Sequence, residues 1–150
     1  MKDATRHLDK RFSTLRPLTE SARPPKGWVR AIRDALGMTT AQLAQRLGVS
    51  QPRVVELEKS EVGGNVSLNS LQRAAEALGC RLVYVLVPER PLAETVRERA
   101  ELVAQRQINA VAQSMRLEDQ EVTSKDAAKE LQRRHVERLL QQPARLWDDA

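Results

Sequence analysis

Apolar positions recur at helical spacing along most of this chain, and glycine or proline interrupts them at short intervals. The spacing predicts four short helices, over about 27–36, 39–47, 50–59 and 67–78. A glycine follows three of these segments, and a serine or threonine opens three, as expected for capped helices. The pattern therefore predicts a helical domain over residues 27–79.

The second and third of these helices form a pattern of their own. Thr39 and Gln42 have the spacing of a capping box at the start of the first of the two. Gly48 is expected to take the left-handed conformation at the turn, and the small Ala44 lies where the two helices would touch. Val54 gives the following helix an inward anchor. Together these features predict a helix-turn-helix, which presents the N-terminal end of its second helix to the DNA major groove.

The exposed face of that second helix carries side chains suited to reading DNA. Gln51 can bond adenine at N6 and N7, Glu56 can accept from cytosine N4, and Arg53 can reach guanine or a phosphate. Thr40, at the start of the preceding helix, offers a hydroxyl and free N–H groups to a phosphate oxygen. Exposed polar residues also occur on helices without any function, but the joint pattern favours DNA binding. The predicted DNA-binding residues are Thr40, Ser50, Gln51, Pro52, Arg53, Glu56 and Lys59.

The outer two helices of the domain are expected to complete its core. The inward face of the helix over 27–36 would contain Trp28, Ile32, Ala35 and Leu36. We interpret Trp28 as a core anchor and Arg33, on the opposite face, as solvated. The inward face of the helix over 67–78 would contain Leu68, Leu71, Ala74, Ala75 and Leu78. Cys80, which follows that helix, is interpreted as a small buried apolar residue rather than a reactive thiol.

Residues 80–87, CRLVYVLV, change from the helical period to that of a strand, and Pro88 ends the run. A lone strand cannot satisfy its own backbone donors and acceptors. The favoured solution is antiparallel pairing with the same strand of a second subunit about a two-fold axis. The alternatives are a partner segment within residues 10–20, or an irregular buried segment. A dimerisation strand is therefore predicted over 80–88, with the interface residues Leu82, Tyr84 and Leu86.

Two regions flank this central part. Residues 1–26 are basic and contain a helical stripe over about 3–15, followed by a proline-containing linker. This segment either packs as a helix on another element or a second subunit, or forms an arm that follows DNA phosphates. Residues 92–142 predict a long helix and then a second helix that begins at a capping box of Thr123 and Asp126. Such a pair buries its apolar stripe against the body, a second subunit or a partner protein.

The net charge of +5 lies near the start of the chain. Residues 1–35 contain nine Lys or Arg and four Asp or Glu, whereas the remaining residues contain sixteen of each and balance. The excess therefore lies in and just before the first helix of the central domain. This distribution indicates a polyanion at the N-terminal half, and a solvated basic tail is the alternative.

Other features exclude several classes of protein. The single cysteine excludes an intrachain disulfide and a cysteine-rich zinc site. No stretch is long and apolar enough to span a membrane, and no signal-peptide pattern is present, so we expect a cytoplasmic protein without membrane contact. The sequence lacks a phosphate-binding glycine loop, a nucleophile with a base, and metal-ligand spacing; His7 and His135 lie far apart. We therefore expect no enzymatic activity, no cofactor and no metal.

Residues 27–79 resemble the Xre/Cro-type helix-turn-helix repressors, above all in the stretch QLAQRLGVSQPRVVELEK. In that family, Ala44, Gly48 and residues 50–53 would have the roles assigned above. Pro52 departs from the family pattern, which often has a polar base contact there, and would offer a thymine methyl group an apolar contact instead. The segment CRLVYVLVP resembles the dimerisation strand of antitoxin-type members. The resemblance implies a mostly all-α fold, with a five-helix domain, one C-terminal strand and a two-helix extension.

Most of the chain resembles the bacterial family called mobile mystery protein A. The segments that carry this resemblance are GWVRAIRDALGMTTAQLAQRLGVSQ, VELEKSE and LQRAAEALGCRLVYVLVP. Its members are typically encoded beside a Fic-domain protein, an enzyme that transfers AMP to hydroxyl groups. The segment from Ser114 to Glu118 is similar to the Ser/Thr-x-x-x-Glu inhibitory motif of Fic systems, in which the Glu blocks the ATP site. Asp119 departs from that motif, and the end of a helix is the other interpretation of these residues.

Two functional hypotheses follow. The first is a dimeric, sequence-specific DNA-binding repressor that controls its own operon from a palindromic operator on double-stranded DNA, with a Fic-domain protein encoded nearby. The alternative is an antitoxin-like interaction module, in which residues 92–142 bind and restrain that Fic enzyme. The two hypotheses are compatible.

Overall fold

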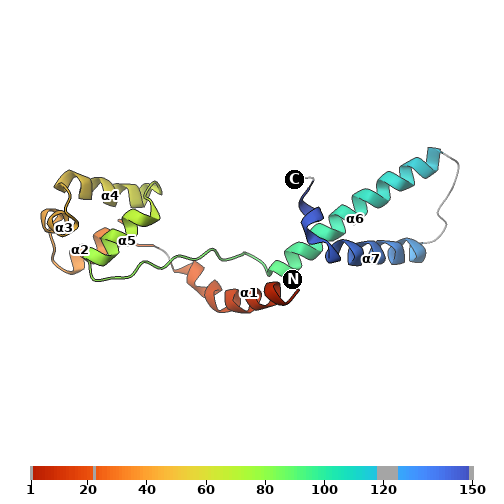
Figure 1. The fold of residues 1–150 in the computed structure, drawn as a ribbon, viewed down its shortest axis with the longest axis horizontal. Coiled ribbons are helices and arrows are strands. Elements are labelled where there is room, and N and C mark those ends of the chain that lie inside the picture. Colours follow the sequence, from red (N-terminus) through yellow and green to blue (C-terminus); the bar gives the residue numbers. More distant parts are fainter. Residues whose placement is uncertain (1, 22, 118–124, 149–150) are drawn as a thin grey trace. The chain divides into compact units, whose positions relative to one another are not determined.

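The computed structural model describes residues 2–21, 23–117 and 125–148. Every regular element in these ranges is a helix (Figure 1). The chain divides into two compact units. One unit is formed by residues 17–86, and the other by both ends of the chain, up to residue 16 and from residue 87 onward. The central part of the sequence therefore forms one compact unit, and its two flanking regions together form the other.

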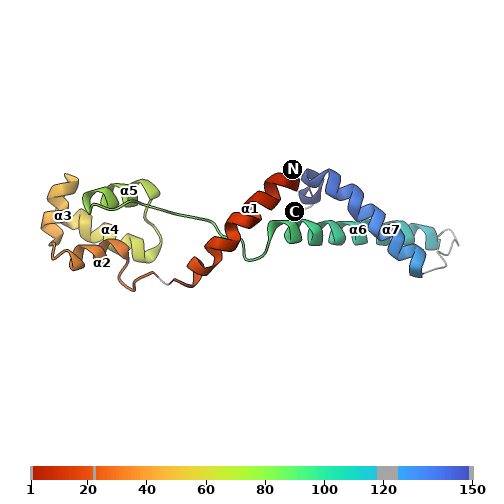
Figure 2. The same cartoon turned by 90° about the horizontal axis from the view of Figure 1, so that it is seen from below.

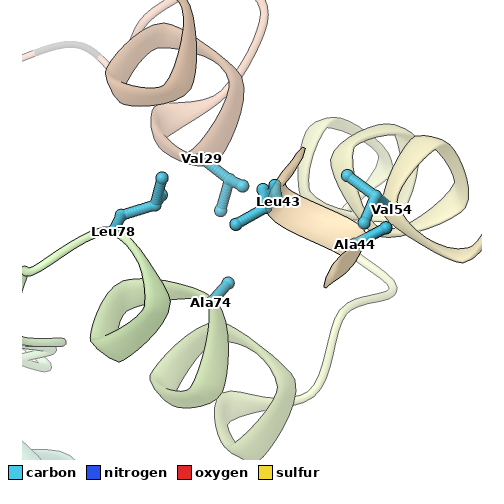
Figure 3. Close-up of a cluster of buried hydrophobic side chains, with 6 residues drawn as sticks. All are labelled: Val29, Leu43, Ala44, Val54, Ala74 and Leu78. Atoms are coloured by element: carbon cyan, nitrogen blue, oxygen red, sulfur yellow. The ribbon is translucent and has the colours of Figure 1, made fainter. Parts of the chain in front are cut away.

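The unit of residues 17–86 contains four α-helices that surround one core. They are α2 Trp28–Ala35, α3 Thr40–Leu47, α4 Gln51–Gly63 and α5 Leu68–Ala77, preceded by the 3-10 helix η1 Arg16–Glu20. Each of the four helices predicted over 27–78 is present. Figure 3 shows the buried side chains Val29, Leu43, Ala44, Val54, Ala74 and Leu78. A core this small depends on each of its members, which come from all four helices.

The start of α3 and the turn between α3 and α4 both have the local structure that the sequence predicts. Thr39 Oγ1 accepts from the Gln42 N–H at 3.2 Å, and Gln42 Oε1 accepts from the Thr39 N–H at 2.8 Å, which completes the capping box. Gly48 has a φ of 67°, in the left-handed region that a residue without Cβ adopts readily. Ser50 occupies the N-cap of α4, but its side chain makes no capping hydrogen bond. The capping box therefore fixes the start of α3, and the bend into α4 depends mainly on Gly48.

The orientation of α2 differs from the prediction. Trp28 is 51% exposed and Leu36 is also exposed, whereas Val29 and Arg33 are buried. The predictions that Trp28 anchors the core and that Arg33 faces water are wrong. The physical reason is that Arg33 has a carboxylate partner inside the unit, Glu58 on α4, which turns positions 29, 32 and 33 inward.

Two predictions near α5 are also wrong. Leu68 is exposed, because it is the first residue of α5 and the inward positions begin one turn later. Cys80 is exposed rather than buried, since it follows the end of the helix at Gly79, where the chain leaves the core. Ala74 and Leu78 supply the buried apolar contacts of this region instead.

The predicted strand over 80–88 is not seen, although the structure describes all of these residues. They run without helix or strand between α5 and α6 (Figure 1). A strand requires a neighbouring backbone ladder, and the described residues give this segment none. Residues 10–20 cannot serve as the partner, because they are helical. The fifth helix implied by the resemblance is absent as well, since residues 27–79 contain four.

The unit formed by the two chain ends is a helical hairpin with additions at its base. Its elements are α1 Lys2–Leu15, α6 Leu92–Leu117, α7 Lys125–Gln141 and the 3-10 helix η2 Pro143–Trp147. The helix α7 runs back along α6 (Figures 1 and 2), and its first residues follow a gap, so that Thr123 lies outside the described residues. Their core contains Ala100, Val103, Ala104, Val136 and Leu146. The long helix and its successor are present as predicted, whereas η2 is not predicted by the sequence pattern.

The helix α1 is attached to the start of α6 by a side-chain cap. Asp9 accepts from the Leu92 N–H at 2.6 Å through Oδ1 and from the Ala93 N–H at 3.1 Å through Oδ2. A carboxylate at this position satisfies two of the N–H groups that the first turn of any helix leaves unpaired. The half-buried Phe12 lies about one turn further along the same face of α1. The N-terminal helix is therefore packed on another element of the chain.

Candidate nucleic-acid interface

The first turn of α4 is exposed, and the contact of this helix with the core begins at Val54, which is fully buried. The chain reaches this turn through a tight bend. In the bend, the Val49 N–H donates to the Ala44 carbonyl at 3.0 Å, and the Gly48 N–H donates to the Gln45 carbonyl at 3.2 Å. The bend and Val54 together fix the direction of α4 and leave its first turn clear of the core.

The predicted DNA-binding residues lie at the surface around this turn. Six of them are exposed: Ser50, Gln51, Pro52, Arg53, Glu56 and Lys59. Thr40 is half-buried at the start of α3. Gln51 Nε2 donates to Thr40 Oγ1 at 2.9 Å, so the structure brings the starts of α3 and α4 together. This bond uses one N–H of the Gln51 amide and leaves its second N–H and its carbonyl oxygen for another partner.

Val55 shares this surface and is absent from the residues predicted above. It is 37% exposed and borders a shallow hollow together with Gln51, Pro52, Glu56 and Lys59. Its position four residues after Gln51 places it on the same face of the helix, and this spacing is the signal that could have found it. An apolar side chain at such a position can contact a thymine methyl group.

A second, polar hollow lies between α4 and the start of α5. It is lined by Arg53, Glu56, Leu57, Ser60, Asn65, Val66, Ser67 and Ser70. Ser67 Oγ accepts from the Ser70 N–H at 3.1 Å and thereby caps α5 as predicted. Hydroxyl, amide and guanidinium groups beside a recognition helix are the types that bind phosphate oxygens in protein–DNA complexes. The sequence motif does not reveal this hollow, because its lining comes from two helices and the loop between them.

Arg33 and Glu58 form a buried ion pair that holds α4 against α2. Arg33 Nε donates to Glu58 Oε1 at 2.6 Å and Nη2 donates to Oε2 at 3.2 Å, a bidentate geometry. Arg33 Nη1 also donates to the Met38 carbonyl at 2.8 Å. The hydrogen bonds with Glu58 raise the pKa of Arg33 above its ordinary value. Since Met38 directly precedes the Thr39 cap of α3, this guanidinium connects three helices.

Glu61, near the end of α4, caps the N-terminus of α2. Its carboxylate accepts from the Trp28 N–H at 2.6 Å and from the Val29 N–H at 3.0 Å. The side chain of Arg23 donates to the Glu61 carbonyl oxygen at 2.7 Å. A Cβ at Gly27, whose φ is 85°, would lie 2.2 Å from Glu61 Oε2, so a residue larger than glycine would displace the cap. The second half of α4 is therefore held by contacts to residues outside the helix-turn-helix motif.

The other predicted site residues do not gather at this surface. Leu82 is half-buried, whereas Tyr84 and Leu86 are exposed on the segment that follows α5. Ser114 is exposed on α6 in the unit formed by the chain ends, and Glu118 lies outside the described residues.

A family model described as helix-turn-helix matches residues 29–85. No curated protein and no solved structure matches the chain. Residues 29–85 therefore form a helix-turn-helix domain of the Xre type, the class found in DNA-binding transcription regulators. The prediction of this class is confirmed. The match extends past the end of α5 to residue 85, so it includes most of the irregular segment.

Two further classes of site were sought in the part of the chain that the structure describes. No group of three or more His, Cys, Asp or Glu side chains there has the arrangement to hold a metal ion. No helix there is both long enough and apolar enough to cross a lipid bilayer.

Proposed function

We propose that this protein is a sequence-specific repressor that places the start of α4 in the major groove of double-stranded DNA. The observation that carries the proposal is the exposed first turn of α4, whose Gln51 amide is held by Thr40. The Gln51 carbonyl oxygen and its second N–H match the N6 donor and N7 acceptor of adenine. Because the amide is already oriented before binding, less conformational entropy is lost when it meets the base.

The neighbouring side chains would complete the readout. Glu56 can accept from cytosine N4, Arg53 can donate to guanine or a phosphate, and Val55 can contact a thymine methyl group. Thr40 lies at the N-terminus of α3, where the helix dipole favours a phosphate oxygen. Contacts to phosphates would position the domain, and contacts to base edges would select the sequence.

A dimer on a palindromic operator is the arrangement that we propose for repression of its own operon. Tyr84 and Leu86 are 69% and 87% exposed in a single chain. Their segment has the β-branched and apolar composition of a strand and lacks the ladder that a strand requires. Pairing with the same segment of a second subunit would supply that ladder and cover both side chains. Two helix-turn-helix domains related by a two-fold axis bind half-sites about one turn of DNA apart and exclude the transcription machinery.

Replacing Gln51 and Arg53 together by alanine is expected to weaken binding to the operator at least 30-fold and to weaken binding to a scrambled duplex much less. Each good base contact contributes about 1–3 kcal/mol of discrimination. Gel shifts with the DNA upstream of the gene measure both affinities, and wild-type binding should weaken as salt rises.

The matched control is Gln105→Ala with Arg106→Ala, an exposed Gln–Arg pair on α6 that has the same composition and charge. It should leave both affinities unchanged. Equal operator affinities for the wild type and the Gln51/Arg53 double variant would contradict the proposal.

We also propose that the unit formed by the chain ends binds a Fic-domain protein, as the resemblance to mobile mystery protein A implies. Large apolar side chains that remain exposed on α6 and α7 support a partner at this unit: Leu102, Val111 and Leu131. Co-expression of the two proteins should give a complex that co-purifies and that is lost when Val111 and Leu131 are replaced by serine. Retention of the complex by this double variant, or failure of the wild-type pair to associate at micromolar concentration, would contradict the assignment.

A further inference from the structure

The face of α1 that points away from α6 carries basic side chains without partners. Arg6, Lys10 and Arg11 are exposed, as is His7 between them. Within the part of the chain that the structure describes, none of the three charged groups forms an ion pair or a side-chain hydrogen bond. These side chains are therefore available to an external anion.

The acidic residues of α1 do not neutralise this face. Asp9 is three residues after Arg6, but both of its oxygens accept from the N–H groups at the start of α6. Asp3, three residues before Arg6, is exposed in the first turn, and no ion pair joins the two among the described residues. Lys10 and Arg11 have no Asp or Glu three or four residues away on either side. The middle of the outer face is therefore uniformly basic.

A comparison with α7 in the same unit shows that this is not a general property of its helices. There Arg133 pairs with Glu130 at 2.8 Å and with Glu137 at 2.6 Å, and Arg134 pairs with Glu130 at 2.9 Å. The bonds from Arg133 and Arg134 lower the pKa of Glu130 to about 2. Arg133 and Arg134 are thus paired with carboxylates on their own helix, whereas Arg6, Lys10 and Arg11 of α1 are not.

The helix that carries these cations is itself anchored. The cap from Asp9 and the half-buried Phe12 keep the inner face of α1 on α6. Arg6 and Lys10 therefore start from one row along the outer face, and His7 and Arg11 start from the next, with members of a row about 6 Å apart along the axis. Unpaired cations spaced along an anchored helix suit a regular polyanion better than a single small anion.

We propose that the outer face of α1, formed by Arg6, Lys10 and Arg11, binds phosphates of the DNA that flanks the operator. The inference rests on the proposed function, because the helix-turn-helix domain would deliver α1 to the duplex. Between α1 and α2, the 3-10 helix η1 rises about 10 Å and residues 21–27 extend at most about 25 Å, which gives about 35 Å in all. Phosphates within roughly 10 base pairs are thus in reach, at a high effective concentration.

The test uses the full-length triple variant Arg6→Gln, Lys10→Gln, Arg11→Gln, which leaves Asp9 and Phe12 in place. Fluorescence anisotropy is measured over a range of salt on an operator duplex with 12-base-pair flanks. Loss of three phosphate contacts should reduce the slope of log affinity against log salt by about 2–3, while the preference for operator over scrambled duplex stays the same. Removing the flanks should bring the wild-type slope down to that of the variant.

The control is Arg106→Gln, Lys125→Gln, Lys129→Gln, which removes the same charge from exposed positions of the same unit. It should retain the wild-type slope. Equal slopes for the wild type and the α1 variant, or an equal loss in the control, would overturn the inference. So would an unchanged DNA slope combined with α1-dependent sedimentation with phosphatidylglycerol vesicles, which would assign the face to a membrane surface. Absence of any operator preference in the wild type would instead contradict the proposed function.

Discussion

Replacing Glu58 with alanine is expected to destabilise the unit of residues 17–86 by about 3–5 kcal/mol, because it removes the buried, bidentate partner of the Arg33 guanidinium. The remaining carboxylate, that of Asp34 at 3.0 Å from Nη1, is exposed to water. Arg33 is 8% exposed, so water cannot replace the lost carboxylate without opening the unit. A loss of this size is comparable to the whole stability of a small domain. The helix α4 would then lose its fixed direction, and operator binding would be lost with it.

The loss of stability caused by Glu58→Ala can be measured in one unit at a time, because each unit contains one tryptophan. Trp28 lies in the unit of residues 17–86, and Trp147 lies in the other. In a Trp147→Phe background, Trp28 fluorescence during urea denaturation reports on the helix-turn-helix unit. Glu56→Ala, which removes an exposed carboxylate two residues away, should change the free energy of unfolding by no more than about 0.5 kcal/mol.

A second variant separates the charge from the packing. Replacing Arg33 by methionine together with Glu58 by leucine removes both charges and keeps apolar volume, so it should destabilise less than Glu58→Ala alone. A single Glu58→Ala variant within 1 kcal/mol of the wild type would show that the ion pair does not hold α4 in place.

Replacing Glu61 with alanine is expected to cost about 3 kcal/mol in the same unit. Its carboxylate accepts two backbone N–H groups at the start of α2, and hydrogen bonds to a charged group contribute about 1.5–3 kcal/mol each, without full additivity. Because the cap is 5% exposed, the two N–H groups would be left largely without water. Urea denaturation followed by Trp28 fluorescence measures this loss as well.

The matched variant is Glu61→Gln, which keeps one carbonyl acceptor and the length of the side chain but removes the charge. It should fall between the wild type and Glu61→Ala. If glutamine and alanine are equally destabilising, the charge of the carboxylate is the whole contribution; if neither has an effect, α2 does not depend on this cap.

The sequence contains enough local information to predict the helices and the turn that positions α4. Thr39 pairs with Gln42 three residues away. Gly48 adopts the left-handed conformation readily because it has no Cβ, which depends on no other residue. The exposed positions of α4 also follow from local periodicity, since Val54 and its helical neighbours define the inward stripe. Predictions of this kind depend on residues within one or two turns of each other, and for that reason they agree with the structure.

The misplaced residues depend on partners far away in the sequence. Arg33 is separated by 25 positions from Glu58, and no periodicity shows that a cation will be buried there; the rotation of α2 and the exposure of Trp28 follow from that pair. Glu61 caps a helix that begins 33 residues earlier. Residues 80–88 have the composition of a strand, but a strand also needs a neighbour, which a single chain does not supply. The helical spacing from Gln51 could have predicted that Val55 belongs to the candidate interface. It could not have predicted the polar hollow between α4 and α5, whose lining comes from two helices and the loop between them.

The attachment of α1 through Asp9 affects the order in which the protein can mature during synthesis. Asp9 leaves the ribosome early, but the Leu92 N–H that donates to it is made 83 residues later. At about 5–20 residues per second, the nascent α1 waits roughly 4–17 s for its partner. The DNA-binding domain is translated entirely within that interval, so it can fold while the helix that precedes it is still unpaired.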